Sequence, residues 1–480
     1  MQLRRILQTI GVSLCALACL MLFPALVDLA DRNADWQVFI SSALFTAFLG
    51  GLMLVSAIDN TANEFSLKEG FALTTLSWVA IAAFSALPFA GLGLDYTDAY
   101  FEAMSGLTTT GSTVLTGLDK LPRGILLWRS ILQAVGGIGI VVTAIIMLPF
   151  LRVGGMQLFH TESSDRSEKI TPRSGQLFIW ITNFYLGLIL ICTFAYVTLG
   201  MTPFDAICHA MTTVSTGGFS THDASLSFFQ SDAILWTAIV FMLLGSLPFV
   251  VMIRALRGQP AAFYNDEQVR GFLGFVVGVS LIFAIWHSEV YNAPFQQSLL
   301  TTTFNVVSII STTGFAYEDY TQWSQFAVVL IFLLTFVGGC AGSTAGGIKI
   351  YRFQVSGLLI KGHFRTLTSP HRVFPLSYNR KRLADDVPFS IIAFLTTYVA
   401  TVAFFTLLLA ALGLDHITAL SAAATAIGNV GPGLGDIVGP KGSFAPLPAM
   451  AKWALSAAML LGRLELFTVL VLLRPEFWRE

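Results

Sequence analysis

The chain has 480 residues, of which 55% are hydrophobic and only 11% are charged, and its formal net charge is −1. Soluble domains carry a charge on about 25% of their residues, so this composition excludes a soluble globular protein and predicts a polytopic membrane protein. A net charge near zero gives no basis for a nucleic-acid partner. The five cysteines show no C-x-x-C spacing, which supports neither a disulfide framework nor a zinc site.

Apolar stretches that can cross a membrane recur along the whole chain. A ~30 Å hydrocarbon core takes roughly 20 helical residues. The first stretch follows Arg4 and Arg5 as a signal peptide would, but its length and the absence of a small-residue cleavage site favour a retained helix. Ten spans are predicted, near residues 6–27, 37–58, 70–92, 124–150, 176–200, 233–254, 270–291, 324–350, 386–412 and 448–473.

Lysine and arginine cluster on alternate connections between these spans, which is the positive-inside pattern of cytoplasmic loops. The clusters are the N-terminus and residues 152–173, 254–270 and 349–382. Both termini are therefore expected in the cytoplasm. The opposite loops are rich in aspartate and glutamate, and an acidic outer face would concentrate cations weakly.

Four short glycine motifs are the most informative feature of the sequence. Their last glycines are about 107, 96 and 117 residues apart, which predicts the same point in four repeated units. A small hydroxyl residue precedes each last glycine by six positions, at Ser105, Thr212, Ser308 and Thr425. The motifs are Thr108-Thr109-Thr110-Gly111, Ser215-Thr216-Gly217-Gly218, Ser311-Thr312-Thr313-Gly314 and Gly428-Asn429-Val430-Gly431.

Each motif ends a short apolar stretch, at residues 95–107, 202–214, 295–310 and 415–427. Segments this short are more typical of re-entrant helices than of spans. Non-helical backbone is tolerated at membrane depth only where protein surrounds it or water wets it, so the four motifs are expected on one central axis. There, carbonyl oxygens can replace the hydration shell of a monovalent cation, while the carboxyl ends of the short helices direct partial negative charge at the centre.

The predicted fold class is an all-α polytopic membrane protein. Four pseudo-symmetric repeats of span, pore helix, filter strand and span surround one central pore, preceded by two extra transmembrane helices. One such motif alone would favour a loop or a small-residue helix contact, whereas four in register favour a pore. The predicted units are the helix pair 1–69 and the repeats 70–174, 175–268, 269–385 and 386–480.

The fourth motif is expected to be the least regular. Pro432 follows its last glycine, and Asn429 occupies a position that is threonine or glycine elsewhere. The pore is therefore expected to be only approximately fourfold.

Residues 338–347, GGCAGSTAGG, interrupt the second span of the third repeat with five glycines. Each glycine costs about 1 kcal/mol of helix propensity relative to alanine, so this stretch predicts a loop within the membrane. Close helix packing through small residues is the alternative. A phosphate-binding loop is excluded because Lys349 follows Ile348 and not a glycine. The glycines are Gly338, Gly339, Gly342, Gly346 and Gly347.

Arg463 lies inside the last predicted span, about 16 Å before Arg474 at a helical rise of ~1.5 Å per residue. An ionised group at this depth is a candidate functional residue. A structural ion pair with another helix is the alternative. Glu465 is only two positions away, so along a helix it points to nearly the opposite face.

The strings TTTGST, STGGFSTHD, STTGFAYEDY, IGNVGPGLGD, GGCAGSTAGGIKIYR and LGRLELF resemble, in this order, the motifs of the Trk/Ktr/HKT superfamily of potassium transporters, closest to bacterial TrkH. The resemblance covers essentially the whole chain. It implies a single-chain version of a four-subunit potassium channel that moves K⁺ into the cell across the inner membrane, with no organic cofactor. In the family, glycine at all four filter positions goes with potassium selectivity and serine at the first goes with sodium permeation. Here the first is Gly111.

The resemblance also implies roles for residues and partners. Residues 338–347 would form a gate beneath the filter, lined by Ser343 and Thr344. Arg463 would face the pore and interact with that gate. The basic run 349–382 would dock a cytosolic nucleotide-binding regulator resembling TrkA, although the positive-inside bias alone also accounts for it. A homodimer is implied. The K⁺-holding backbone would be that of Thr109, Thr110, Gly111, Thr216, Gly217, Gly218, Thr312, Thr313, Gly314, Asn429, Val430 and Gly431.

Two other functions are weighed against the pore. A secondary transporter that couples K⁺ to H⁺ or Na⁺ would be built from inverted repeats, whereas the four predicted units all place their short helix on the outer side. A membrane enzyme would need a cluster of titratable groups, a nucleophile with its base or a metal set within the spans, and the sequence shows none.

Overall fold

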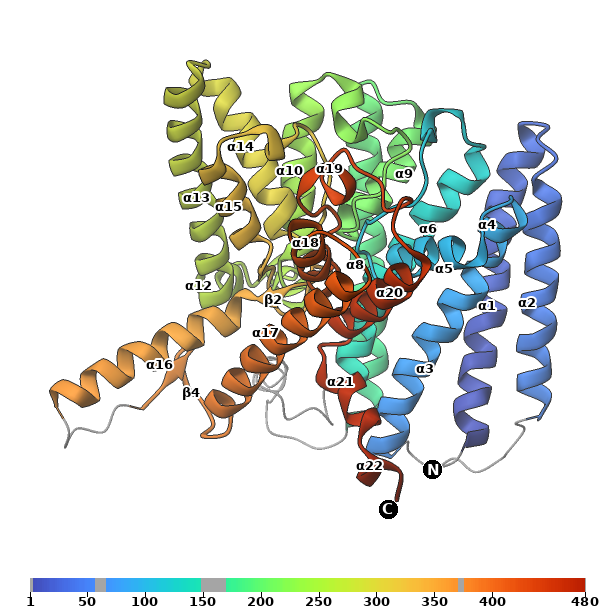
Figure 1. Ribbon diagram of the computed structural model, residues 1–480. Helices are drawn as coiled ribbons and strands as arrows, with labels where there is room; N and C mark the ends of the chain where they lie inside the picture. The colour runs from blue at the N-terminus through green and yellow to red at the C-terminus, as the bar shows by residue number, and fades with distance from the viewer. Residues whose placement is uncertain (1–2, 57–65, 148–169, 370–374, 480) are drawn as a thin grey trace.

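The computed structural model describes residues 3–56, 66–147, 170–369 and 375–479. The regular elements of the described residues are helices, apart from two pairs of two-residue strands. Figure 1 shows that the N- and C-termini lie at the same end of the molecule, here called the lower end, while α19 (Gly435–Val438) lies near the upper end. Of the predicted basic cluster 152–173, residues 152–169 lie outside the described residues.

Seven helices among the described residues are long and apolar enough to cross a membrane, and nine spans result if each of two sharply bent helix pairs counts as one. The prediction of ten spans fails at residues 324–350. There α15 (Gln325–Leu334) has only ten residues before the glycine-rich stretch begins. The molecule is therefore an all-helical polytopic membrane protein with interrupted helices.

The first two helices, α1 (Leu3–Ala30) and α2 (Trp36–Ser56), form an antiparallel pair at one side of the molecule (Figure 1). Gly11 and Gly50 lie at their crossing, where a Cβ on Gly11 would come within 2.8 Å of the Gly50 carbonyl oxygen. Small residues at a crossing let two helices approach closely inside a membrane. The Asp28 carboxylate accepts a hydrogen bond from the Gly124 amide at 2.7 Å, which connects this pair to α6 (Arg123–Met147).

Four long helices each precede one of the four short helices that the sequence predicts. The short helices agree with their predicted ranges to within one residue at each end. The long helices are α3 (Leu67–Ser85, continued by α4, Leu87–Gly91), α8 (Ile170–Thr198), α13 (Glu267–Tyr291) and α17 (Val387–Ala411), and the short ones are α5 (Tyr96–Leu107), α9 (Pro203–Val214), α14 (Phe295–Ile310) and α18 (His416–Gly428).

Side chains at their N-termini explain where three of the short helices begin. Asp95 accepts from the Thr97 amide, Thr202 accepts from the Asp205 amide, and Asp415 accepts from the amides of two residues of α18. Each cap satisfies backbone donors that have no partner within the helix.

The helices that follow the glycine motifs differ from one another. In the first unit, α6 is continuous, whereas α10 (Asp232–Ser246) and α11 (Phe249–Leu256) meet at 101° and α20 (Ala449–Arg463) meets α21 (Phe467–Leu470) and its 3₁₀ extension at 109°. Pro248 at the first bend cannot donate a helical hydrogen bond. At the second bend, Glu465 and Leu466 adopt left-handed backbone conformations. Arg463 is therefore the last residue of α20, and the depth predicted for it from an unbroken helix to Arg474 is wrong.

The interruption at residues 338–347 is closed at its base by a short parallel strand pair, β1 (Val337–Gly338) and β2 (Ile348–Lys349). The chain then continues as α16 (Ile350–Thr368), which extends away from the helical body at its lower end (Figure 1). The remaining strands and α-helices are the hairpin strands β3 (Ser377–Tyr378) and β4 (Lys381–Arg382) and the short helices α12 (Ala261–Asn265) and α22 (Pro475–Arg479). Three 3₁₀ helices of the described chain lie in connections, at Leu118–Lys120, Ser225–Phe229 and Tyr320–Gln322.

Candidate functional site

The four glycine motifs share one backbone conformation. We call residues 109–111, 216–218, 312–314 and 429–431 the filter segments. In each segment the first and third residues have positive φ. The φ angles are 52° and 85° at Thr109 and Gly111, 52° and 77° at Thr216 and Gly218, 58° and 78° at Thr312 and Gly314, and 53° and 101° at Asn429 and Gly431.

The same hydrogen bond joins every segment to the short helix before it. In each case, the amide of the middle residue donates to the carbonyl of the hydroxyl residue five positions upstream. The bonds run from Thr110 to Ser105 (2.9 Å), Gly217 to Thr212 (2.9 Å), Thr313 to Ser308 (2.9 Å) and Val430 to Thr425 (3.0 Å). The four hydroxyl residues therefore occupy equivalent positions in the structure, as their spacing predicted. Their hydroxyl groups, however, do not share one type of contact.

The segments contact one another in closed cyclic order. A Cβ added to the last glycine of any segment would lie within 3.0 Å of the middle carbonyl oxygen of the next one. The pairs are Gly111 with Gly217, Gly218 with Thr313, Gly314 with Val430 and Gly431 with Thr110. Only glycine combines positive φ at low cost with the absence of a Cβ, so both features of this ring require it at all four positions.

The fourth segment has positive φ at the same two positions as the other three. These backbone angles do not show the irregularity that the sequence predicted for it. Its difference lies in the side chain of Asn429. The Nδ2 group donates to Thr110 Oγ1 at 3.0 Å and to the Met459 carbonyl at 2.9 Å. Asn429 therefore ties the fourth segment to the first segment and to α20.

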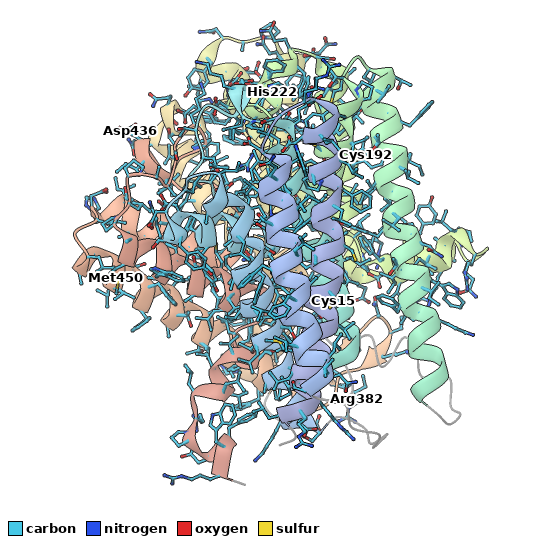
Figure 2. All side chains as sticks on the ribbon, turned by 90° about the vertical axis from the view of Figure 1, so that its right-hand side faces the viewer. Cys15, Cys192, His222, Arg382, Asp436 and Met450 are labelled. Carbon is cyan, nitrogen blue, oxygen red and sulfur yellow. The ribbon has the colours of Figure 1, made fainter. Side chains whose placement is uncertain are left out.

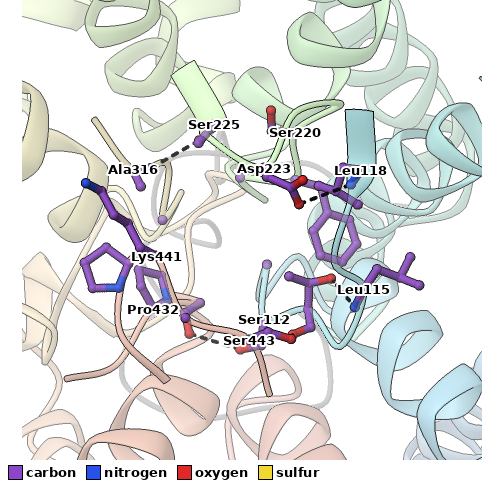
Figure 3. Close-up of a pocket in the computed structure, with 18 of the residues that line it drawn as sticks. Ser112, Leu115, Leu118, Ser220, Asp223, Ser225, Ala316, Pro432, Lys441 and Ser443 are labelled. Atoms are coloured by element: carbon purple, nitrogen blue, oxygen red, sulfur yellow. Dashed lines mark hydrogen bonds between the residues drawn. The ribbon is translucent and has the colours of Figure 1, made fainter. Parts of the chain in front are cut away.

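A cavity of about 150 Å³ lies on one side of the ring and is bordered by the last glycines of all four segments. Figure 3 shows polar side chains around it, including Ser112, Asp223 and Lys441. His222 also lines the cavity, and Figure 2 places it near the end of the molecule opposite Arg382. The cavity therefore faces the end away from the chain termini.

The glycine-rich stretch 338–347 packs against the opposite side of the ring. The Gly346 amide donates to Thr312 Oγ1 at 2.6 Å. Thr344 Oγ1 lies 3.2 Å from Thr216 Oγ1, and it is also within hydrogen-bonding distance of the Gly245 and Val214 carbonyls. The stretch is thus a loop in contact with two filter segments, as its composition predicts. The Ser343 hydroxyl donates within the loop to the Cys340 carbonyl at 2.7 Å.

Arg463 connects this loop to the first repeat. Its Nη1 donates to the Thr344 carbonyl at 2.8 Å and its Nη2 donates to the Gly136 carbonyl on α6 at 3.1 Å. The side chain is buried, and among the described residues no carboxylate lies within 4.0 Å of it. The described residues therefore show no structural ion pair for Arg463.

The first residues of the basic run 349–382 are buried and do not belong to a solvated loop. Lys349 donates to the Ala345 carbonyl. Arg352 pairs with Glu465 at 2.5 Å and stacks on the ring of Phe394. Glu465 is thus the ion-pair partner of Arg352 and not of Arg463. The exposed basic residues of this run begin only at Lys361, on the part of α16 that extends from the body.

Sequence reasoning missed two ion pairs made by α5, one fully buried and one at the first turn of the helix, where the aspartate is partly exposed. Glu102 on α5 pairs with Arg129 on α6 at 2.8 Å, and Asp98 on α5 pairs with Lys452 on α20 at 2.5 Å. The signal was available, because an ionised residue within an apolar segment marks a candidate functional position.

His222 joins the first and second repeats at the rim of the cavity. Its Nδ1 lies 2.5 Å from Asp119, its Nε2 lies 3.6 Å from Asp205, and its ring stacks on Phe228. Burial alone lowers the pKa of His222, but the two carboxylates outweigh burial and raise that pKa above its ordinary 6.5. The hydrogen bond from His222 lowers the pKa of Asp119.

Comparison with known proteins identifies the family. A family model described as TrkH, cation transport protein, matches residues 35–479.

The chain belongs to the TrkH family of cation transport proteins. This confirms the resemblance drawn from the motif strings, and it assigns the chain to transporters and not to enzymes. The crystal structure of the potassium transporter TrkH from Vibrio parahaemolyticus matches with a TM-score of 0.92 at 34% identity, over 100% of both chains.

Curated relatives in the family match over nearly their full length. The Trk system potassium uptake protein TrkI of Halomonas elongata is 47% identical over 99% of this chain and 97% of its own. The Trk system potassium uptake protein TrkH of Escherichia coli is 35% identical over 100% of both chains.

The His222 contacts predict a pH-dependent contribution to stability. Because the pKa of folded His222 is raised, its pairing stabilises the fold fully below the unfolded value of 6.5 and loses this effect as pH rises through the folded value. His222→Gln should therefore lower the melting temperature of purified protein at acidic pH and much less at alkaline pH. His363→Gln on the exposed face of α16 is the control. An equal loss at both pH values would contradict the pairing.

The Arg463 contacts predict that this side chain restrains the 338–347 loop. Loss of two hydrogen bonds of about 1 kcal/mol each shifts an equilibrium roughly 5–30-fold, so Arg463→Ala should raise basal cation flux in proteoliposomes. Deletion of residues 338–347 should raise it further. Arg382→Ala, at an exposed site, should leave flux unchanged. Lower flux in both the substituted and the deleted protein would show that neither element is a barrier.

Proposed function

We propose that this chain is a potassium uptake protein of the bacterial inner membrane, acting as the K⁺-selective, pore-forming subunit of a Trk-type system. The observation that carries this proposal is the closed ring of four filter segments with one backbone conformation. The naming of relatives at 47% and 35% identity as potassium uptake proteins supports it. The transported ion is K⁺, and the chain itself needs no organic cofactor.

In this proposal, residues 70–174, 175–268, 269–385 and 386–480 are four repeats around one pore, and residues 1–69 are an additional helix pair. The short helices α5, α9, α14 and α18 all end at the ring, so their carboxyl ends direct partial negative charge toward it. A cation at this point is stabilised and an anion is repelled. Backbone carbonyls of the twelve filter-segment residues replace water around K⁺.

The 338–347 loop is the proposed gate. It touches the second and third filter segments on the side facing the chain termini, and Arg463 fastens it to α6. Of its residues, Gly346 and Thr344 make the contacts that close the path, while Gly338, Gly339, Gly342 and Gly347 permit close packing and Ser343 supports the loop internally.

The positive-inside pattern places both termini, and hence this loop, on the cytoplasmic side. The exposed basic residues of α16 and the segment that follows it are then available to a cytosolic nucleotide-binding regulator resembling TrkA. A homodimer in the membrane completes the proposed assembly.

Coupled secondary transport of K⁺ with H⁺ or Na⁺ is less well supported than a pore. Inverted repeats are expected of such transporters, whereas here all four short helices end at one ring.

The filter assignment is tested by Gly111→Ser in purified protein reconstituted into liposomes. A serine here meets both an unfavourable φ of 85° and the Gly217 carbonyl, so we expect K⁺ over Na⁺ discrimination, read from reversal potentials, to fall by about tenfold, which corresponds to about 1.4 kcal/mol.

Gly93→Ser is the matched control for that experiment. Gly93 has a φ of +99° with nothing within 4 Å of an added Cβ, so it imposes similar backbone strain without touching the ring. Unchanged selectivity in Gly111→Ser would argue against the filter assignment, and K⁺ flux absent from the wild-type protein would overturn the proposed function.

A further inference from the structure

The four short helices carry different residues at one equivalent position. Nine residues before each last glycine stand Glu102, His209, Asn305 and Ala422, and all four are fully buried. Two residues after the same glycines stand Thr113, Ser220, Ala316 and Gly433. In the first two repeats, these two positions are joined by a side-chain hydrogen bond.

In the first repeat, Glu102 holds the chain just beyond the filter segment. Thr113 Oγ1 donates to the Glu102 carboxylate at 3.0 Å, and the Val114 amide donates to it at 2.9 Å. Arg129 Nε also donates to this carboxylate at 2.8 Å. A buried carboxylate with a cationic partner and two further donors is a satisfied and rigid anchor.

In the second repeat, His209 plays the same part. Its Nδ1 lies 2.8 Å from the Asp205 carbonyl, and its Nε2 lies 2.9 Å from Ser220 Oγ. A carbonyl oxygen only accepts, so Nδ1 carries the proton, and Nε2 of the neutral ring accepts from the Ser220 hydroxyl. The tautomer of His209 is thereby set by its neighbours.

Residues of α6 fasten these two anchored segments to each other. Arg129 Nη1 donates to the Ser220 carbonyl at 2.8 Å, and its guanidinium lies over the ring of Phe219. Gln133 donates to the Gly217 carbonyl at 2.6 Å and accepts from the Phe219 amide at 3.0 Å. The first and second filter segments are therefore one cross-linked unit.

In the third and fourth repeats, these two positions are not joined by a side-chain hydrogen bond. Their short helices reach the chain beyond the filter segment through the small hydroxyls of Ser308, which donates to the Phe315 carbonyl at 2.8 Å, and Ser421, which accepts from the Leu434 amide at 3.0 Å. Ala316 and Gly433 have no hydrogen-bonding side chain, and Ala422 has none either. Asn305 donates to the Thr301 carbonyl at 2.9 Å, and its Oδ1 has no hydrogen-bond partner in the described structure. The helix after the third motif, α15, contains no basic residue that could replace Arg129. In the helix after the fourth motif, α20, Lys452 pairs with Asp98.

We propose that Glu102, His209 and Arg129 are positioning residues for ion selectivity, holding the first two filter segments in shape through buried charged and imidazole groups that the third and fourth repeats do not have at these positions. This inference rests on the proposed function. A carbonyl cage that keeps its width does not contract around the smaller Na⁺. The geometry that these three residues maintain therefore sets the discrimination between K⁺ and Na⁺.

The test measures the K⁺/Na⁺ permeability ratio of purified variants in liposomes. Ser220→Ala leaves the buried His209 Nε2 without its donor, and Thr113→Val removes the corresponding hydroxyl at nearly constant shape. Each loss of a buried partner should lower the ratio by roughly 5–10-fold. Glu102→Gln should lower it at least as much, because it leaves Arg129 without its counter-charge.

Two controls match these variants. Thr113→Ser keeps the hydroxyl and should restore the wild-type ratio. Asn305→Ala, at the same position of the third repeat, should change the ratio less than about twofold, since Asn305 donates only within its own helix and makes no bond to the chain beyond the filter segment. A fall in Asn305→Ala as large as that in Ser220→Ala would overturn the asymmetry.

The readout separates positioning from folding and from the proposed function. A smaller amount of folded protein lowers K⁺ and Na⁺ flux together and leaves the ratio unchanged, so a changed ratio supports positioning even where Glu102→Gln expresses poorly. A selective wild type with unchanged ratios in Ser220→Ala and Thr113→Val would overturn this inference alone. A wild type without K⁺ selectivity would overturn the proposed function as well.

Discussion

The rest of the structure depends on the contact between each filter glycine and the carbonyl oxygen of the next segment. Four backbones meet around one axis only if each has positive φ at the point of closest approach and no Cβ to obstruct its neighbour. This constraint accounts for glycine at the last position of all four motifs. It also accounts for the four short helices, because each must end where the ring begins.

Irregular backbone at such a depth needs partners for its polar groups, and the surrounding helices provide them asymmetrically. Gln133 and Arg129 of α6 bind the second segment, Asn429 binds the first, and Thr344 and Gly346 approach the second and third from below. The pseudo-fourfold backbone is thus held by contacts that are not fourfold. In the proposed function, selectivity and gating therefore have different structural supports within one ring.

The buried charges also differ between the two sides of the ring. Glu102 and Arg129 neutralise each other behind the ring, whereas Arg463 reaches two carbonyls and has no carboxylate partner among the described residues. Of these two carbonyls, the one of Thr344 lies on the loop, so Arg463 loses that hydrogen bond when the loop moves. Arg463 is accordingly suited to a moving contact, and the Glu102–Arg129 pair is suited to a permanent one.

Amino-acid order alone determined the features that depend on local composition and spacing. Apolar length predicted most spans, glycine spacing predicted four equivalent segments, and the glycine content of residues 338–347 predicted a loop. These properties follow from backbone propensity and from transfer between water and lipid, which each segment expresses by itself.

Only the tertiary structure decided which segments meet. The cyclic order of the ring, the bend at Glu465 and Leu466, and the partners of Glu102, Arg352 and Arg463 all join residues that are distant in the chain or depend on such neighbours. A side chain's partner is set by packing across helices, and no periodicity within one helix encodes it. For that reason the basic run 349–382 looked uniform in sequence, although its first residues are buried beside the proposed gate.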